Sequence, residues 1–184
     1  MRNEDGRRVL DLWCGRAKRE GAIGVDWSAD SDADVVADID APYLPFKDDS
    51  FDEVVMIDTL EHVASVKAAV CEAGRVLRPG GRIFVRAPHF SSLHMYSDFT
   101  HRNFFSAEGV RRMAGDHPEY GHYYTSGFEL VSLRIKLWRA WRVLGIEWLA
   151  NRFPLTYEKL FAFRFPAMAL EFCLTPKRKS VNKS

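Results

Sequence analysis

The chain has 184 residues, of which 47% are hydrophobic and 28% are charged. This length suits one domain with a full core, and this composition excludes a disordered or fibrous protein. Its three cysteines have no paired spacing, which excludes a disulfide framework or a cysteine zinc site and is typical of a reducing cytoplasm. The polar first residues and the lack of a long apolar run predict a cytoplasmic protein without a signal peptide or transmembrane segment.

The formal net charge of +1 conceals an uneven distribution of charge along the chain. Residues 1–133 contain 15 Lys or Arg and 22 Asp or Glu, a net charge of −7, whereas residues 134–184 contain 11 and 3, a net charge of +8. A basic C-terminal surface of this kind either binds an anionic substrate, lipid headgroup or partner, or packs against the acidic part of the same fold.

Short apolar segments closed by polar or turn residues predict buried parallel strands in the first half of the chain. They lie at residues 8–12, 22–26, 35–39, 51–57 and 82–87. Apolar residues at helical spacing predict a helix over residues 65–77, which Arg78-Pro79-Gly80-Gly81 would end. The connections to the second and third strands are too short for the usual crossover helices, so we expect loops there.

The second half of the chain is predicted to complete an α/β sheet. Residues 88–105 combine histidines with aromatic residues and serines, which is typical of a long functional loop. A helix is expected to start at Ser106, and strands are predicted at residues 128–138 and 167–175. We therefore expect one Rossmann-like domain over residues 1–175, mostly parallel with an antiparallel last strand and abbreviated first helices, and a basic disordered tail at 176–184.

Four blocks of sequence occur in a characteristic order: Val9-Leu10-Asp11-Leu12-Trp13-Cys14-Gly15, Gly24-Val25-Asp26, residues 44–52 and residues 75–81. In these blocks the chain resembles the class I S-adenosylmethionine-dependent methyltransferases. The resemblance implies that residues 1–175 form a methyltransferase domain. It further implies transfer of a methyl group from S-adenosylmethionine to a hydroxyl or amine of a small-molecule acceptor.

The resemblance assigns cofactor-binding roles to residues at the ends of the first two strands. Asp11 would orient the first turn, and Gly15 would bring the backbone close to the methionine part of the cofactor. Asp26 would accept hydrogen bonds from the two ribose hydroxyls, because a carboxylate offers two acceptor oxygens to two adjacent donors. Trp27 would flank the adenine ring.

Two further cofactor positions follow from the same resemblance. Asp38, with Ile39 beside it, matches the position that meets the adenine amino group, and Asp40 competes with Asp38 for this role. Trp13 stands where the family usually has glycine. Its indole either fills the space of the missing first helix or intrudes on the cofactor, so a catalytically impaired cofactor-binding or partner-binding pseudoenzyme is an alternative.

A second group of polar residues follows the fourth predicted strand, at Asp58, Glu61 and His62. Their D-x-x-E-H spacing resembles the E-x-x-E-H metal motif of ubiquinone-pathway O-methyltransferases and small-RNA 2′-O-methyltransferases, and His101 occupies a place comparable to a further histidine of the latter. The resemblance implies that Asp58, Glu61, His62 and His101 hold Mg²⁺, Mn²⁺, Fe²⁺ or Zn²⁺, which would lower the pKa of a substrate hydroxyl.

Imidazole offers a second way to activate the acceptor, because it titrates near neutral pH. His62, His89 and His101 are therefore the candidates for catalytic groups. The metal motif makes a metal-dependent RNA 2′-O-methyltransferase the alternative enzyme. The near-neutral net charge and the lack of a dedicated RNA domain argue against nucleic acid as a partner.

Residues 138–166 form an insertion between the last two predicted strands. Its tryptophans and leucines recur at helical spacing, whereas Arg139 and Arg142 point elsewhere. We expect this segment to set acceptor specificity, as a lid, a homodimer contact or a helix at a membrane interface. A helix packed on the sheet is the alternative.

Overall fold

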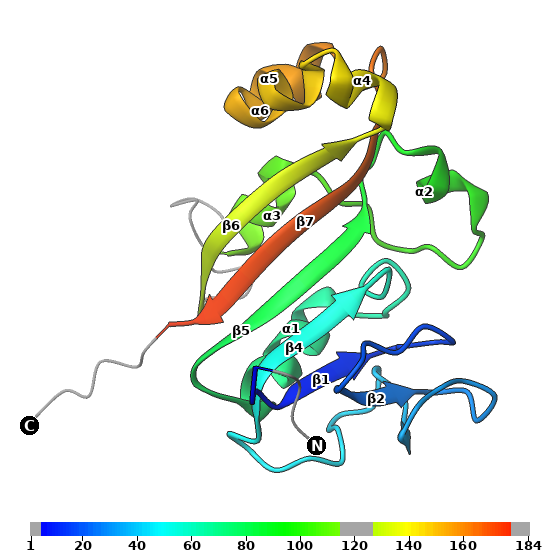
Figure 1. The fold of residues 1–184 in the computed structure, drawn as a ribbon, viewed down its shortest axis with the longest axis vertical. Helices are drawn as coiled ribbons and strands as arrows, with labels where there is room; N and C mark the ends of the chain where they lie inside the picture. The colour runs from blue at the N-terminus through cyan, green and yellow to red at the C-terminus, as the bar shows by residue number, and fades with distance from the viewer. Residues whose placement is uncertain (1–4, 115–126, 178–184) are drawn as a thin grey trace, which may run out of the picture.

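Seven strands within residues 5–114 and 127–177, the part of the chain that the computed structural model describes, form one sheet (Figure 1). The strand order is β3-β2-β1-β4-β5-β7-β6. The strands are β1 (Val9–Leu12), β2 (Ile23–Asp26), β3 (Val35–Val36), β4 (Phe51–Ile57), β5 (Leu77–Pro88), β6 (Phe128–Leu137) and β7 (Ala167–Pro176). β7 runs antiparallel to both of its neighbours, and the other pairs are parallel. This confirms the predicted Rossmann-like sheet with an antiparallel last strand.

The helices lie in the connections between the later strands. They are α1 (Val66–Val76), α2 (Leu93–Ser97), α3 (Ala107–Met113), α4 (Arg139–Val143), α5 (Ile146–Arg152) and α6 (Pro154–Leu160). α1 begins at Ser65 and α3 at Ser106, because each serine side chain accepts a hydrogen bond from a backbone N–H of the first turn. Residues 13–22 and 27–34 contain turns in place of helices, which confirms the predicted loops.

Two strands differ in length from their predictions. β3 ends at Val36 rather than at residue 39, because the carboxylate of Asp40 accepts hydrogen bonds from the backbone N–H of Ala64 and turns the chain away from the edge of the sheet. β5 begins at Leu77, which pairs with Phe51, and the register shifts before Arg82 pairs with Glu53. α1 ends before residues 78–81 as predicted, and these residues form an irregularity within β5.

The predicted helical segment at residues 138–166 is three short helices rather than one. Gly145 adopts a left-handed φ of 77° between α4 and α5, and Pro154 begins α6 directly after α5. Both residue types interrupt a helix, since glycine tolerates positive φ and proline lacks the N–H donor. The helices form a cap beyond the ends of β6 and β7 (Figure 1).

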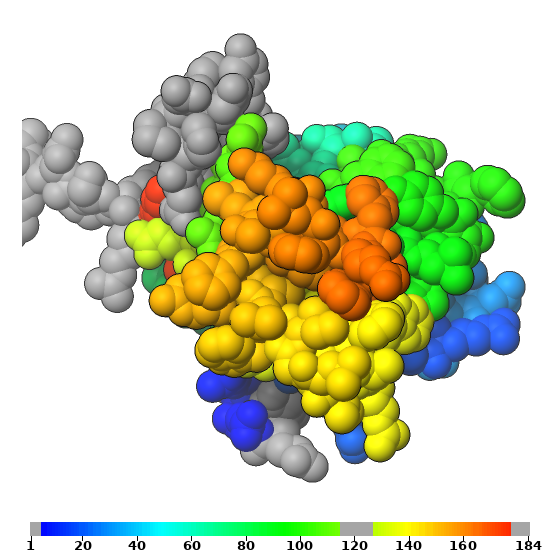
Figure 2. Space-filling model, turned by 90° about the horizontal axis from the view of Figure 1, so that it is seen from above, coloured from blue at the N-terminus to red at the C-terminus, as the bar shows by residue number. Residues whose placement is uncertain are grey.

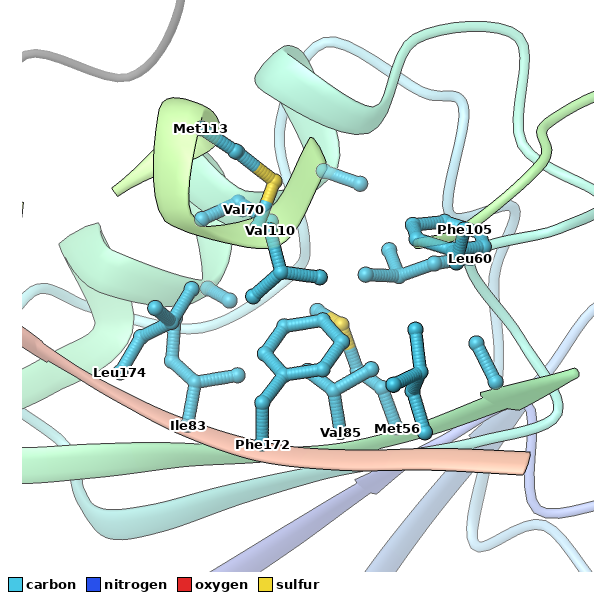
Figure 3. Packing of buried hydrophobic residues seen from close by; sticks show 14 of the residues in the cluster. Met56, Leu60, Val70, Ile83, Val85, Phe105, Val110, Met113, Phe172 and Leu174 are labelled. Carbon is cyan, nitrogen blue, oxygen red and sulfur yellow. The ribbon is translucent and has the colours of Figure 1, made fainter. Parts of the chain in front are cut away.

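The main core lies between the sheet and the helices α1 and α3. Figure 3 shows Met56, Val85 and Phe172 of the sheet facing Val70 of α1 and Val110 of α3, and all five are at most 1% exposed. Because side chains alternate across a strand, the same strands present a second face. There the carboxylate of Glu53, on a residue only 4% exposed, contacts the guanidinium groups of three arginines, which are Arg7 at 3.8 Å, Arg19 at 3.2 Å and Arg82 at 3.2 Å.

The end of the chain was predicted to be a disordered basic tail from residue 176. β7 extends to Pro176, and the backbone N–H of Lys177 donates to the carbonyl of Gly127. Residues 178–184 lie outside the described part, so disorder there stays a prediction. None of the described helices is long and apolar enough to cross a membrane.

Candidate functional site

The turn after β1 is held by two carboxylates. Asp11, which is 4% exposed, accepts a hydrogen bond from the backbone N–H of Arg19 at 2.7 Å. Gly15 has a φ of 54° and donates its N–H to Asp26 Oδ2 at 3.0 Å. Asp11 therefore orients the short loop that stands in place of a first helix, and burial raises the pKa of its carboxyl group.

Asp26 ends β2 next to this turn, as parallel strands place their carboxyl ends at one edge of the sheet. Its Oδ1 accepts the backbone N–H of Ser28 at 2.9 Å, in addition to the bond from Gly15. Each carboxylate oxygen has two lone-pair sites, so these bonds leave one site on each oxygen for a further donor. The adjacent Trp27 is 66% exposed, which leaves its ring free to lie against a ligand.

The loop after β3 distinguishes the two competing aspartates. Both carboxylate oxygens of Asp40 accept the backbone N–H of Ala64, at 2.9 and 3.1 Å, which ties this loop to the one after β4. Asp38 is exposed and accepts the N–H of Asp40 through Oδ1 alone, and Ile39 is buried beside it. Asp38 is thus the aspartate with an open oxygen.

Trp13 occupies a strained position between the two groups of candidate residues. Its φ is 57°, in the left-handed region, where a bulky residue costs roughly 1–3 kcal/mol. The strain is held by a hydrogen bond from its N–H to the carbonyl of Val25 at 2.7 Å. The indole lies 5.5 Å from the ring of His62, between centroids, and its Nε1 is buried without a partner among the described residues.

Glu61 is the most isolated carboxylate in the described part of the chain. It is 0% exposed, and neither of its oxygens has a hydrogen-bond partner there. Burial raises its pKa to about 7. Its backbone carbonyl accepts the N–H groups of Arg102 and Asn103, at 2.7 and 3.1 Å, which brings the segment around residue 101 against the loop after β4.

Two imidazoles stand beside Glu61. The rings of His62 and His101 are 4.7 Å apart between centroids, and one potential ligand atom from each of Glu61, His62 and His101 lies within 4.8 Å of the others. His62 Nδ1 is 2.8 Å from Thr100 Oγ1, and His101 Nδ1 is 3.0 Å from the carbonyl of Met95. Burial and the neighbouring His101 lower the pKa of His62. This group can accept a proton or hold a divalent cation.

Two of the predicted site residues lie apart from this group. Asp58 forms an ion pair with Arg86, whose Nη2 and Nε both face its carboxylate, so the structure places it outside the predicted metal set. His89 is fully buried, with Nδ1 2.8 Å from Ser91 Oγ and Nε2 3.2 Å from Glu158 Oε1. Because both of its nitrogens have protein partners, we do not retain His89 as a catalytic candidate.

A cavity of about 410 Å³ opens beside the histidines, at the ends of β4 and β5. Its lining includes Asp58, Arg86, His94, Asp98, His101 and Met168. The site therefore has two adjacent parts. One comprises Asp11, Asp26 and Asp38 at the ends of β1 to β3, and the other is this cavity with the imidazole of His101 in its wall.

Comparison with known proteins was made for the whole sequence. A family model described as a methyltransferase domain matches residues 14–85. The demethylmenaquinone methyltransferase of Mycobacterium tuberculosis strain H37Rv is 39% identical over 99 aligned residues, with 46% of this chain and 42% of that protein covered. The ubiquinone/menaquinone biosynthesis C-methyltransferase UbiE of Paracoccus denitrificans is 50% identical over 46 residues, covering 25% and 18%. The chain thus spans less than half the length of these curated relatives.

Solved structures share the whole fold. A methyltransferase from Archaeoglobus fulgidus, described as dependent on S-adenosylmethionine, superposes with a TM-score of 0.60 at 20% identity, covering 93% of this chain and 86% of that one. The chain thus shares the fold of this methyltransferase, and its likeness to a methyltransferase domain extends over residues 14–85. The matched residues 14–85 contain Asp26, Asp38 and Glu61, whereas Asp11 and most of the lining of the cavity lie outside the match.

The residues at the ends of β1 to β3 fit S-adenosylmethionine, the cofactor that the resemblance implies. Asp26 retains an acceptor site on each oxygen, Trp27 presents an exposed ring, and Asp38 retains an open oxygen. The ring of Trp13 is partly exposed beside them, whereas its N–H is buried. These donors and acceptors suit a ligand that carries both an adenosine and an amino acid moiety.

The sequence pattern did not predict the partners that define the second part of the candidate site. Arg86 binds Asp58, and Thr100 contacts His62. A signal for the first was available, because Arg86 is a charged residue at the end of an apolar strand whose neighbour in the sheet, Ile57, directly precedes Asp58. Nothing in the sequence pattern marks Thr100.

Proposed function

We propose that this chain transfers a methyl group from S-adenosylmethionine to a small-molecule acceptor held in the cavity beside His101. The observation that carries the proposal is Glu61, a fully buried carboxylate without a hydrogen-bond partner among the described residues, next to two imidazoles. Burying a carboxylate without a partner lowers the stability of the fold. A role as a proton acceptor at a reaction site explains why the chain has such a carboxylate.

The acceptor that we propose is an aromatic ring of the quinone type, methylated at carbon. Support comes from the names of the two relatives, one a demethylmenaquinone methyltransferase and the other a C-methyltransferase. The resemblance described above implies a hydroxyl or amine acceptor. A phenolic hydroxyl is still involved under the present proposal, because removal of its proton makes the neighbouring ring carbon nucleophilic.

The roles of the residues follow from this chemistry. His101 lines the cavity, so it is placed to take the phenolic proton, with His62 and Glu61 behind it to share the charge. The ring carbon then forms a bond to the methyl carbon as the methyl–sulfur bond breaks, which leaves a neutral thioether. Loss of the hydrogen on that ring carbon as a proton restores the aromatic ring. The remaining requirement is alignment of the two reactants.

Two experiments test the proposal in sequence. Calorimetry with S-adenosylhomocysteine should detect binding to the wild-type chain and a loss of about tenfold or more for Asp26→Ala, with Asp40→Asn as the control for the neighbouring loop. Transfer of a labelled methyl group to a reduced, demethylated naphthoquinone analogue should then fall about 10²-fold or more in Glu61→Gln. Binding without transfer to any acceptor would favour the pseudoenzyme, and no binding would end the proposal.

A metal-dependent transfer to a hydroxyl is the second candidate, favoured by the approach of Glu61, His62 and His101 to within 4.8 Å of one another. Elemental analysis separates the two candidates. Under our proposal the purified wild type and Glu61→Gln contain equal, substoichiometric metal, and chelation leaves methyl transfer unchanged. Stoichiometric metal that Glu61→Gln lacks would support the second candidate. The RNA alternative would additionally require a salt-dependent RNA gel shift.

A further inference from the structure

The cap, defined as residues 138–166 with helices α4 to α6, turns large apolar side chains outward. Val143 is 76% exposed, Phe163 74%, Leu160 70%, and Leu144 and Trp148 are each 68%. Figure 2 shows that this segment, coloured yellow to orange, covers the middle of the molecule seen from above. Single exposed apolar residues are ordinary, but five large ones within residues 138–166 mark a binding surface.

The cap cannot bury these side chains by folding on itself. Its helices have five, seven and seven residues, so each buries little of its own surface. The buried residues of the cap are the small or central ones, Ala150, Tyr157 and Ala162. A cavity of about 400 Å³ remains between the helices, with an apolar lining that includes the exposed Leu149, Phe153 and Phe161.

The acidic and basic residues of the cap differ in their contacts. Its two acidic residues are turned inward, where Glu147 accepts the backbone N–H of Leu137 at 2.9 Å and Glu158 accepts that of Glu108 at 3.3 Å. All of its basic residues are exposed and make no ion pair with any described residue. They are Arg139, Arg142, Arg152, Lys159 and Arg164.

We propose that the cap docks on an anionic phospholipid bilayer. A surface that interleaves apolar side chains, tryptophan and unpaired cations matches the bilayer interface, where the apolar groups enter the headgroup region and the cations meet anionic lipids. Arg152 lies over the ring of Phe153, at 5.0 Å from its centroid, so cation and apolar group share one surface. The helices are too short to span the bilayer, and docking of this kind does not require it.

A second copy of the chain fits this surface less well. A symmetric dimer would place the cap against an identical cap, since a twofold interface uses the same patch on both subunits. Five exposed cations would then face five like charges, with both acidic residues of each cap already turned inward. The charge that complements the cap is therefore negative, which a bilayer with anionic lipids supplies.

The cap also lies against the segment that borders the acceptor cavity. Trp138 is 5.4 Å from His94, between ring centroids, and His94 lines that cavity. Phe163 contacts Phe90 in the same segment, at 5.6 Å. A bilayer on the cap would thus lie close to the cavity, which suits an acceptor with an apolar tail. This step alone rests on the proposed function.

Vesicle sedimentation with the full chain tests the proposal. Vesicles of phosphatidylcholine with about 30 mol% phosphatidylglycerol should bind the wild type about tenfold more strongly than pure phosphatidylcholine, and high salt should weaken binding. Leu144→Ser with Trp148→Ser, and separately Arg152→Gln with Lys159→Gln, should each reduce binding about tenfold. The changed residues are exposed, so folding is preserved, and circular dichroism checks it.

Matched substitutions outside the cap provide the controls. Val131→Ser removes a 61% exposed apolar residue of β6, and Arg111→Gln removes an exposed cation of α3, and both should bind like the wild type. Equal binding to neutral vesicles, or equal loss in the controls, would overturn the proposal. So would a dimer in solution that the cap substitutions dissociate. Because neither cofactor nor acceptor is present, failure of the proposed function would leave these results unchanged.

Discussion

At the scale of single residues, Glu61 is a fully buried carboxylate whose two oxygens have no hydrogen-bond partner among the described residues. The D-x-x-E-H pattern identified Glu61 and His62 and suggested Asp58 as their companion. Asp58 instead binds Arg86, 28 residues away, and Glu61 forms no ion pair with any residue that the structure describes. The cation that pairs with a carboxylate depends on which strands are neighbours in the sheet. The D-x-x-E-H pattern therefore predicted the residues of the site better than their contacts.

The raised pKa of Glu61 predicts how stability depends on pH. Burial raises this pKa from 4.5 to about 7 in the folded protein, so between these values the folded state binds more protons than the unfolded chain. The free energy of unfolding should therefore be larger near pH 5 and fall by up to roughly 3 kcal/mol as pH rises through 7. Urea unfolding at pH 5 and pH 8 measures this difference.

Two substitutions isolate the contribution of Glu61. Glu61→Gln should lose the decline between pH 5 and pH 8, because a neutral amide has no proton to release. Glu129→Gln changes an exposed glutamate of β6 and should retain the wild-type decline. A decline of equal size in all three proteins would contradict the burial of an unpaired carboxylate at residue 61.

Trp13 permits a second prediction at this scale. Under the proposed function the partly exposed ring of Trp13 borders the cofactor beside Gly15, so Trp13→Gly should weaken binding of S-adenosylhomocysteine about tenfold, even though glycine relieves the positive φ. Trp13→Phe, which keeps the ring but lacks the donor, should weaken binding to a smaller extent. Tighter binding by Trp13→Gly in calorimetry would instead show that the indole obstructs the cofactor.

At the scale of elements, the sequence predicts the strands and helices that end on strong local signals. β1, β2 and α1 lie within one residue of their predicted bounds, because apolar runs, short connections and the serine cap define them. β3 and the cap differ, for two reasons. The end of β3 depends on a hydrogen bond between distant loops, and the helical spacing in the cap continues across Gly145 and Pro154, which break the helix.

The contribution of Gly145 to the interruption between α4 and α5 can be measured. Its φ of 77° strains any residue with a Cβ, although no atom lies within 4 Å of the Cβ position. Gly145→Ala should therefore lower the free energy of unfolding by about 1 kcal/mol through backbone conformation alone. Gly127→Ala, at an equally open position without a positive φ, should be nearly neutral. Equal effects in chemical denaturation would show that residues 139–152 tolerate a continuous helix.

At the scale of the whole molecule, the structure explains where the uneven charge of the sequence goes. The acidic first part of the chain supplies Asp11, Asp26 and Asp40 to its own turns, whereas five exposed cations of the last part lie on the cap. The alternative, in which the basic part packs against the acidic part, predicts ion pairs for these cations, and the described residues contain none. Charge counting located this surface but could not define its shape.

Because loops replace the first helices, other residues must cover the second face of the sheet near β1 and β4. Glu53 and its arginines provide it, with long aliphatic stems over the sheet and charged ends in contact. Glu53→Gln should lower the free energy of unfolding by about 1–2 kcal/mol, since the carboxylate is buried but the arginines are half-exposed. High salt should reduce the difference from the wild type, as it screens the pairs. Glu129→Gln again serves as the control, and a salt-independent difference would show that packing, rather than charge, holds this face.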